Sequence, residues 1–421
     1  MRIPRRTLVV GAVGVAVALA LTACGPSNSP APSSSGGKPS GTLQIAHWDF
    51  LAPNYGQQMQ DIIKGYEKYN PKATIETVGI VRADYETKLK IQLSAGGGPD
   101  LFTMADTFLP TVAAANLLEP LDNVLTPTTK KALNSTNKGG VYNNKQVAVT
   151  WQIAPYAFLW NKDILAQAGV KPPTTFDELV DAAVTIKQKL GITGFAVRSR
   201  LAEETPWWVD FNNWIQGYGG SWSDGKKLTI DSPQNVAALT AFKKMYDSGA
   251  FSVGDDASTF RTKFSEGQVA MMIDATGAPP AMISAKVPST SMISSPLPFP
   301  KPYTSQVGIY FGINAHTKNK ALAEDFLNWF LTKDTQQALS ENLGNTSTLA
   351  TKTTVSDEFL AKNPWAVGYR EDGENTRSSV IRGFESVTPQ IAHTVLSQVE
   401  KVLLQDVSPQ RALSDAASSL K

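Results

Sequence analysis

Residues 94–108 read Ser-Ala-Gly-Gly-Gly-Pro-Asp-Leu-Phe-Thr-Met-Ala-Asp-Thr-Phe. The three consecutive glycines predict the end of a helix, because glycine adopts positive φ angles without a steric penalty. The apolar run from Leu101 to Ala105 has the length of a buried strand, and Asp106 follows it directly. In open α/β sheets, ligands bind beyond the carboxyl ends of strands. Asp106 is therefore a candidate ligand-binding residue.

The segments on either side of this stretch alternate between strand and helix patterns. Residues 42–48 and 73–80 have the period of two that is typical of strands, while residues 54–69 and 85–93 have helical spacing. A β-α-β-α-β order predicts a mainly parallel, doubly wound sheet flanked by helices. The same alternation begins again after Trp160. We therefore expect an α/β protein with two lobes, between which the chain crosses more than once.

The composition limits the classes of partner. The chain has 421 residues, a formal net charge of +2 and 18% charged residues, below the usual quarter. Such a balance does not indicate nucleic-acid binding, and we expect no nucleic-acid partner. Cys24 is the only cysteine, so an intrachain disulfide is impossible.

The first 23 residues have the layout of a signal peptide. Basic residues at Arg2, Arg5 and Arg6 precede an apolar run from Leu8 to Leu21, which is short for a membrane span. The sequence Leu-Thr-Ala-Cys at 21–24 matches the bacterial lipobox, in which the cysteine is lipidated and becomes the new N-terminus. We expect a signal peptide over residues 1–23 and lipidation of Cys24. The paired arginines leave open export by the Sec or the twin-arginine route.

Residues 25–41 are rich in serine, proline and glycine. A segment with so few large apolar residues cannot bury enough surface to fold. We therefore expect residues 24–41 to be a flexible linker that tethers the folded body to a lipid anchor in the membrane.

Several segments of the body occur in the order typical of one protein family. The chain resembles the extracellular solute-binding proteins of carbohydrate ABC importers, the group that includes maltose- and multiple-sugar-binding lipoproteins. The resemblance rests on Ser94–Gly96 with Pro99-Asp100, Leu159–Gly169, Pro173–Leu179, Phe264–Met271 and Asn319–Leu331. These segments span most of the body, from about Thr42 to Leu343.

The resemblance implies a periplasmic-binding-protein-like fold (type II), with two lobes joined by a hinge and a sugar bound in the cleft. It implies chain crossings near Thr150, Thr276 and Ala315. The N-terminal lobe would comprise residues 42–150 and 277–316, and the C-terminal lobe residues 151–276 and 317–421. Such a protein delivers a sugar or oligosaccharide to the permease subunits of an ABC transporter and performs no chemistry. We expect a monomer without a cofactor or metal.

Aromatic side chains supply the first group of candidate binding residues. Aromatic rings stack on the apolar face of a pyranose, and carboxylates and amides pair with its hydroxyls. Most of the nine tryptophans lie at predicted strand or helix ends, although core packing is the alternative for each. The candidates are Trp48, Trp151, Trp207, Trp208, Trp214 and Trp365, and Trp222 belongs to the same set. Trp214 lies in a segment similar to the family's stacking helix.

Polar residues at predicted strand ends supply the second group. Asp106 matches the family's first-lobe sugar-binding carboxylate. The alternative is that Asp106 is the N-cap residue of the helix that begins at Leu109. Asp100 is interpreted as a structural residue of the glycine-rich turn. Tyr310 stands where the resemblance predicts a glycine-rich pattern after Gly308, which favours a ring in the cleft. Further candidates are Asp49, at the end of the first strand, and Asp274 and Gly277, at the second crossing.

Three other functions are weighed against this interpretation. A glycosidase needs two carboxylates facing each other across a cleft, and the chain has no nucleophile elbow, Walker A or His-Glu-x-x-His motif. A metal-binding lipoprotein needs closely spaced ligands, but the three histidines, His47, His316 and His393, lack metal-ligand spacing. The alternative within the class is a binding protein for an anionic or non-sugar solute, such as a uronate, a sugar phosphate or an amino-acid-like ligand. Pairs of arginines that could hold its acidic group are Arg198 with Arg200 and Arg377 with Arg382.

Overall fold

Eleven strands form the framework of the described part of the chain in a computed structural model, which describes residues 37–52, 56–373 and 375–420. The strands are β1 (Gly41–His47), β2 (Ala73–Gly79), β3 (Leu101–Ala105), β4 (Val141–Tyr142), β5 (Lys145–Gln146), β6 (Val149–Asn161), β7 (Thr193–Ala196), β8 (Val269–Ala275), β9 (Met292–Ser295), β10 (Thr304–Ile313) and β11 (Thr376–Arg377). The predicted signal peptide, Cys24 and linker residues 24–36 lie outside the described residues.

Nine strands form one sheet in the order β2-β1-β3-β10-β6-β8-β7, with β11 paired to β10 and β9 to β6. The pairs β1–β2, β1–β3 and β7–β8 are parallel, whereas β10 runs antiparallel to β3 and β6, and β6 antiparallel to β8. Strands β4 and β5 form a hairpin around Asn143 and Asn144, which both have positive φ angles, as the Asn-Asn turn favours.

Helices cover this sheet, and their apolar faces form its hydrophobic clusters. The α-helices are α1 (Gly56–Lys64), α2 (Tyr66–Tyr69), α3 (Arg82–Ser94), α4 (Leu109–Ala114), α5 (Pro127–Ala132), α6 (Lys162–Ala168), α7 (Phe176–Leu190), α8 (Glu204–Gly217), α9 (Pro233–Tyr246), α10 (Ala257–Ser265), α11 (Pro279–Met282), α12 (Lys320–Phe330), α13 (Lys333–Asn342), α14 (Asp357–Lys362), α15 (Ala366–Asp372), α16 (Thr388–Gln405) and α17 (Pro409–Ser419). Short 3₁₀ helices are η1 (Trp48–Leu51), η2 (Ser135–Gly140), η3 (Leu201–Glu203), η4 (Ser289–Ser291) and η5 (Glu385–Val387). No helix within the described ranges is both long enough and apolar enough to cross a membrane.

The glycine-rich stretch behaves as its sequence predicts. Helix α3 ends at Ser94, Gly96 and Gly98 have φ angles of 73° and 93°, and every residue of β3 is buried. The carboxylate of Asp100 accepts a hydrogen bond from the backbone N–H of Gln44 on β1, at 2.8 Å, and one from the side chain of Thr317. Asp100 is therefore structural, and it joins the turn to β1 and to the segment before α12.

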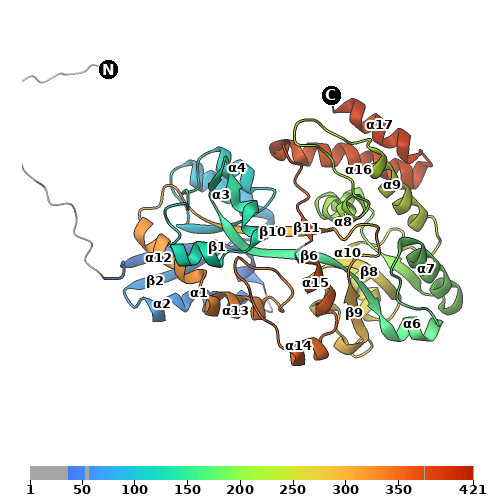
Figure 1. The fold of residues 1–421 in the computed structure, drawn as a ribbon, viewed down its shortest axis with the longest axis horizontal. Helices are drawn as coiled ribbons and strands as arrows, with labels where there is room; N and C mark the ends of the chain where they lie inside the picture. Colours follow the sequence, from blue (N-terminus) through green and yellow to red (C-terminus); the bar gives the residue numbers. More distant parts are fainter. Residues whose placement is uncertain (1–36, 53–55, 374, 421) are drawn as a thin grey trace, which may run out of the picture. The chain divides into compact units, whose positions relative to one another are not determined.

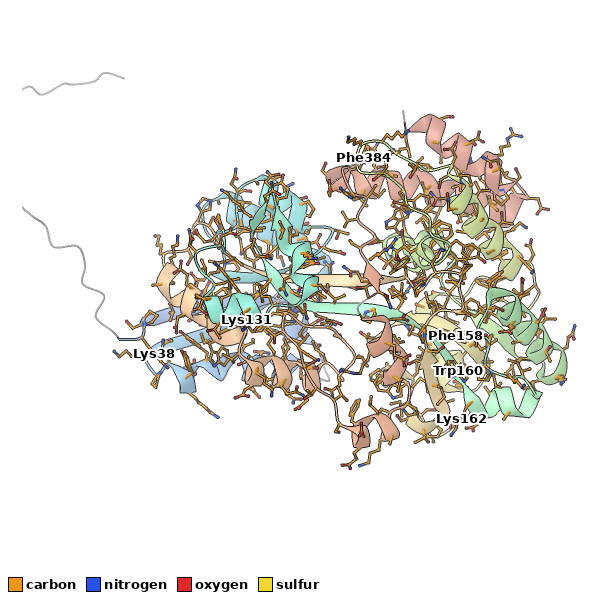
Figure 2. All side chains as sticks on the ribbon, viewed as in Figure 1. Lys38, Lys131, Phe158, Trp160, Lys162 and Phe384 are labelled. Carbon is orange, nitrogen blue, oxygen red and sulfur yellow. The ribbon has the colours of Figure 1, made fainter. Side chains whose placement is uncertain are left out.

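The packing divides the body into two lobes. We call β1–β5 with α1–α5, α12 and α13 the first lobe, and β7–β9 with α6–α11 and α14–α17 the second lobe. Strands β6 and β10 run side by side between them (Figure 1). The first half of β6 pairs with β10, and its second half, from Tyr156 to Trp160, pairs with β8. Phe158 and Trp160, labelled in Figure 2, belong to the hydrophobic cluster of the second lobe. The expected two-lobed α/β architecture is thus present.

The lobe boundaries in the structure differ from those expected. Helices α12 and α13 supply Phe326, Phe330 and Leu339 to the same cluster as β1, so they pack in the first lobe and not in the second. Strand β9 pairs with the second half of β6, so residues near 292 pack in the second lobe and not in the first. The chain therefore crosses at β10 and again near Thr348, which bridges to Ile153, and not near Thr276 and Ala315. Amphipathic segments show which face is apolar but not which lobe that face covers.

Candidate functional site

Asp106 lies immediately after β3, in the position that the sequence predicts. Its backbone N–H donates to the carbonyl of Gly308 at 2.9 Å, and its Oδ2 accepts a hydrogen bond from Ser378 Oγ at 2.8 Å. Ser378 follows β11, so this bond joins the end of β3 to the segment before α16 across the cleft between the lobes. Burial raises the pKa of Asp106 to about 6. The N-cap residue of α4 is Phe108, which removes the alternative role of Asp106 as that cap.

A cavity of about 730 Å³ opens beside Asp106. Its first-lobe wall comes from Asp106, the start of α4, the end of η2, the β4 hairpin and Tyr310. Its second-lobe wall comes from Ser378, Val380, Arg382 and Glu385. A smaller cavity of about 270 Å³ shares Gly139, Tyr310 and Ser378 with it. We call the larger space the cleft cavity.

Tyr310 faces both cavities from β10 and is only 3% exposed. A Cβ atom on Gly139 would lie 1.8 Å from the Tyr310 hydroxyl oxygen, so the ring needs a glycine at position 139. Burial and the nearby charge of Asp106 raise the pKa of the Tyr310 phenol, which keeps it a hydrogen-bond donor. The structure therefore brings the predicted residues Asp106 and Tyr310 to the same cavity.

The predicted tryptophans lie elsewhere. Trp151, Trp207 and Trp214 are 0% exposed. The Trp151 ring packs against Phe330 in the first lobe, and the Trp214 ring packs against Phe242 in the second. These three rings are core residues, and the expectation that they stack on a ligand is corrected accordingly. A pattern of tryptophans near segment ends is equally compatible with the edge of a large apolar core.

The other aromatic candidates also take part in packing. Trp48 is partly buried against Tyr85, with a ring-centroid distance of 4.9 Å. Trp208 and Trp365 are 3% exposed, and their indole N–H groups donate to Ser379 O at 2.9 Å and to Ser289 Oγ at 2.8 Å. None of these three tryptophans lines the cleft cavity. Their expected contact with a ligand is corrected in the same way.

The remaining polar candidates divide by their partners. Asp274 is fully buried, and both of its carboxylate oxygens accept hydrogen bonds from Arg261, each at 2.7 Å. This bidentate pair makes Asp274 structural, which corrects its predicted binding role. Gly277 is exposed, with no atom within 4 Å of the position of a Cβ, and Asp49 lies in η1. Neither Gly277 nor Asp49 lines the cleft cavity.

In one of the two arginine pairs, the charge of Arg198 is neutralised inside the second lobe. Arg198 is 8% exposed and donates to Asp210 Oδ2 at 2.8 Å and to Glu203 Oε1 at 3.3 Å. Burial raises the pKa of Asp210 to about 6, although Arg198 opposes this shift. Arg200 donates to the carbonyl of Gly254 at 2.9 Å. The charge of Arg198 is therefore matched within the lobe, and Arg198 is not a candidate for an acidic ligand.

The described residues do not contain a group of three or more His, Cys, Asp or Glu side chains that could hold a metal ion. His47 is fully buried, and its Nδ1 accepts a hydrogen bond from the N–H of Asp49 at 2.9 Å. Burial lowers the pKa of His47 to about 3, so the ring is neutral at physiological pH.

Sequence reasoning missed most of the cleft cavity. Lys138, Gly139 and Tyr142 come from η2 and the β4 hairpin, and Ser378 and Glu385 come from irregular or short segments of the second lobe. The hairpin itself is recognisable from Asn143 and Asn144, but nothing local indicates that it faces β3. On the second-lobe wall, only Arg382, from the pair with Arg377, is a candidate in the sequence analysis.

These features define a two-lobed α/β protein with a polar cavity between its lobes. A family model for bacterial extracellular solute-binding proteins matches residues 52–337, and the chain belongs to that family. The resemblance that the sequence motifs indicate is therefore confirmed.

Known relatives and structures share the architecture. The maltotriose-binding protein of Pyrococcus abyssi is 25% identical over 347 residues, which cover 78% of this chain and 71% of that protein. The cyclic α-maltosyl-1,6-maltose binding protein of Arthrobacter globiformis has a TM-score of 0.78 at 20% identity, over 90% of this chain and 97% of that one. The GacH receptor of Streptomyces glaucescens has a TM-score of 0.77 at 23% identity, over 90% and 97% of the two chains. At identities this low, the similarity to these two solved structures shows a shared fold and nothing more.

Proposed function

We propose that this protein binds a sugar or oligosaccharide in the cleft cavity and delivers it to the permease subunits of an ABC importer. The observation that carries the proposal is the cavity of about 730 Å³ between the lobes, which both lobes line with polar side chains. The relative named for maltotriose supports a saccharide as the solute.

The chemistry of the cavity suits hydroxyl groups. The Asp106 carboxylate accepts hydrogen bonds, the Tyr310 phenol donates them, and Ser378 can do both. Tyr142 adds an aromatic ring to the first-lobe wall, and Glu385 adds a carboxylate to the second-lobe wall. A ring with hydroxyls at its rim and an apolar face can satisfy these groups together, whereas a purely apolar ligand would leave them unpaired.

Closure follows from the way in which the lobes are joined. Three segments connect them: β6, β10 and the chain near Thr348. A ligand that contacts both walls favours the closed form by its difference in affinity for the open and closed forms. The hydrogen bond from Ser378 to Asp106 marks the place where the walls meet. In this proposal, closing of the lobes creates the surface that the permease recognises.

The signal peptide, Cys24 and the linker would place the protein on the outer face of the cell membrane as a monomeric lipoprotein. The cleft would bind its solute without hydrolysing it. Chromatography of oligosaccharides after prolonged incubation with the protein tests this point, because a glycosidase would release shorter products.

A thermal-shift screen of neutral saccharides, with maltotriose included, tests the proposed function. A ligand at 100 times its Kd adds about 2.7 kcal/mol to stability, which is a readily measured rise in melting temperature. Small-angle scattering of the protein with each hit should then show a smaller radius of gyration than without it. The proposal fails if no saccharide of any kind raises the melting temperature.

A further inference from the structure

A further cavity, of about 370 Å³, is lined on one side by residues 377–382. Helix α8 and the turn at residues 220–223 form the rest of its wall. The two cavities share Ser378, Val380 and Arg382 in their linings. We call this second space the arginine pocket.

The inner wall of the arginine pocket is held in place by hydrogen bonds. Trp222 is 4% exposed, and its indole N–H donates to Asn212 Oδ1 at 2.9 Å. Asn212 donates in turn to the carbonyl of Trp208 at 2.7 Å, and the Trp208 ring stacks on Trp222 with a centroid distance of 5.1 Å. A ligand therefore meets a wall whose side chains are already oriented.

Gln216 in this wall has an unused acceptor. It is 5% exposed, and among the described residues its Oε1 atom has no hydrogen-bond partner. Its Nε2 atom donates to the carbonyl of Arg377 at 3.4 Å. A buried amide oxygen without a donor is unfavourable. A hydroxyl group of a bound ligand would supply that donor.

The charge of the arginine pocket is one-sided. Arg377 and Arg382 line it, and the described lining residues include no aspartate or glutamate. The Arg377 guanidinium lies 3.4 Å from the centroid of the Tyr303 ring, which orients it. Within the described ranges, no carboxylate forms an ion pair with either guanidinium. Both arginines thus keep their charge available, unlike Arg198.

We propose that the arginine pocket binds the anionic group of an acidic saccharide whose remaining units occupy the cleft cavity. Guanidinium groups bind carboxylates and phosphates through paired hydrogen bonds, which makes them selective for such groups. The Oε1 atom of Gln216 accepts a hydrogen bond from a hydroxyl of the same unit. This inference rests on the proposed function and narrows it to saccharides that carry a carboxylate or another acidic substituent.

Calorimetric titration with trigalacturonate and with its fully methyl-esterified, neutral form tests the inference. The two probes have the same length and the same hydroxyls, and they differ in charge. The wild-type protein should bind trigalacturonate at least about tenfold more tightly, and Arg377→Gln and Arg382→Gln should each remove most of this preference. Arg200→Gln is the matched control, because Arg200 lines neither cavity, and it should keep the preference.

A sulfate titration at constant ionic strength tests the pocket without a sugar. Sulfate should raise the melting temperature of the wild-type protein more than that of the double variant Arg377→Gln/Arg382→Gln, and an equal rise in both proteins contradicts an anion site here. The inference is overturned, and the proposed function left intact, if maltotriose or another neutral saccharide binds tightly while trigalacturonate binds the wild type no better than its neutral ester does. Failure of every saccharide, neutral or acidic, to bind contradicts the proposed function itself.

Discussion

Asp106 and Asp274 each stand at or beside the end of a buried strand, yet the structure gives them opposite surroundings. Asp106 follows β3, faces the cleft cavity and accepts a hydrogen bond from the hydroxyl of Ser378. Asp274 lies near the end of β8 and accepts two hydrogen bonds from the guanidinium of Arg261. The first carboxylate has a neutral partner from the other lobe, and the second has a cationic partner from its own lobe.

The difference shows that the partner decides the role of such a carboxylate. A full counterion satisfies the charge of Asp274, which is fully buried inside the lobe and therefore not accessible to a solute. The donors to Asp106 are the Ser378 hydroxyl, the Thr107 backbone N–H and the Gln306 side chain, none of which is a counterion, so the carboxylate can still accept a hydrogen bond from a ligand in the cleft. Both residues lie at the carboxyl end of a strand, where ligands bind in such sheets. The hydrogen-bond partner of each carboxylate decides whether that carboxylate is available to a ligand or is structural.

Removal of Asp274 should produce the largest effect on stability. Asp274→Ala leaves the Arg261 guanidinium without its partner in a partly buried site, which we expect to cost about 3 kcal/mol of the free energy of unfolding. Asp177→Ala is the matched control: its partner is Lys244, both side chains are exposed, and its cost should be below about 1 kcal/mol. Urea unfolding measures both values. Equal losses would show that the Arg261 pair is no more important than a surface pair.

Asp106→Asn should instead affect binding. The amide has nearly the shape of the carboxylate but loses the charge-assisted hydrogen bonds to ligand hydroxyls, and we expect about a 10- to 100-fold loss of affinity. Calorimetry with a saccharide found in the thermal-shift screen measures this loss. The melting temperature without ligand should stay within a few degrees of the wild type. Unchanged affinity would remove Asp106 from the binding site.

The protonation of Asp106 gives a prediction with a definite sign. Its pKa is raised from 3.8 to about 6 in the folded protein, so the folded state holds this proton more tightly than the unfolded state. Ionisation of Asp106 therefore reduces stability as the pH rises from about 4 to about 6. Asp106→Asn lacks this contribution. The melting temperature of the variant minus that of the wild type should therefore increase between pH 4.5 and pH 7. Other carboxyl groups cancel in the difference between the two proteins, and a constant difference would contradict the raised pKa.

Gly308→Ala should have the smallest effect of the set. An added Cβ would lie 3.1 Å from the Cβ and Oδ2 atoms of Asp106, which forces a small displacement of the carboxylate. We expect a loss of affinity of about three- to tenfold, less than that of Asp106→Asn, because the charge remains. Gly277→Ala is the control, since no atom lies within 4 Å of its Cβ position. A larger loss from Gly308→Ala than from Asp106→Asn would show that backbone geometry there outweighs the carboxylate.

Local patterns predicted the elements well where the signal was short-range. The helix stop at the glycines, the buried strand after it and the Asn143-Asn144 hairpin are all present. Thr175 and Glu178 form a capping box at the start of α7, with the backbone N–H of Glu178 donating to Thr175 Oγ1 at 3.3 Å. Each of these features depends on φ angles or on hydrogen bonds between neighbouring residues, which the sequence encodes directly.

Patterns that depend on distant partners were poor predictors. Tryptophans near segment ends suggested a stacking surface, but Trp151, Trp207 and Trp214 have the volume to fill the interior and do so. The resemblance implies that residues 317–421 belong to the C-terminal lobe, but the apolar face of α12 packs with β1 in the first lobe. A ring or an apolar face gains the same free energy in any well-packed interior, so neither specifies its neighbours.

By itself, the sequence determined the family, the alternation of strands and helices and the position of Asp106 at a strand end, because periodicity, turn chemistry and ordered motifs are local properties of the chain. The tertiary structure alone decided that Ser378 meets Asp106, that Arg261 neutralises Asp274 and that Arg377 and Arg382 line a pocket without an acid. These contacts join residues from about a dozen to more than two hundred positions apart. Their geometry depends on how the two lobes pack around β6 and β10, and no local pattern records that packing.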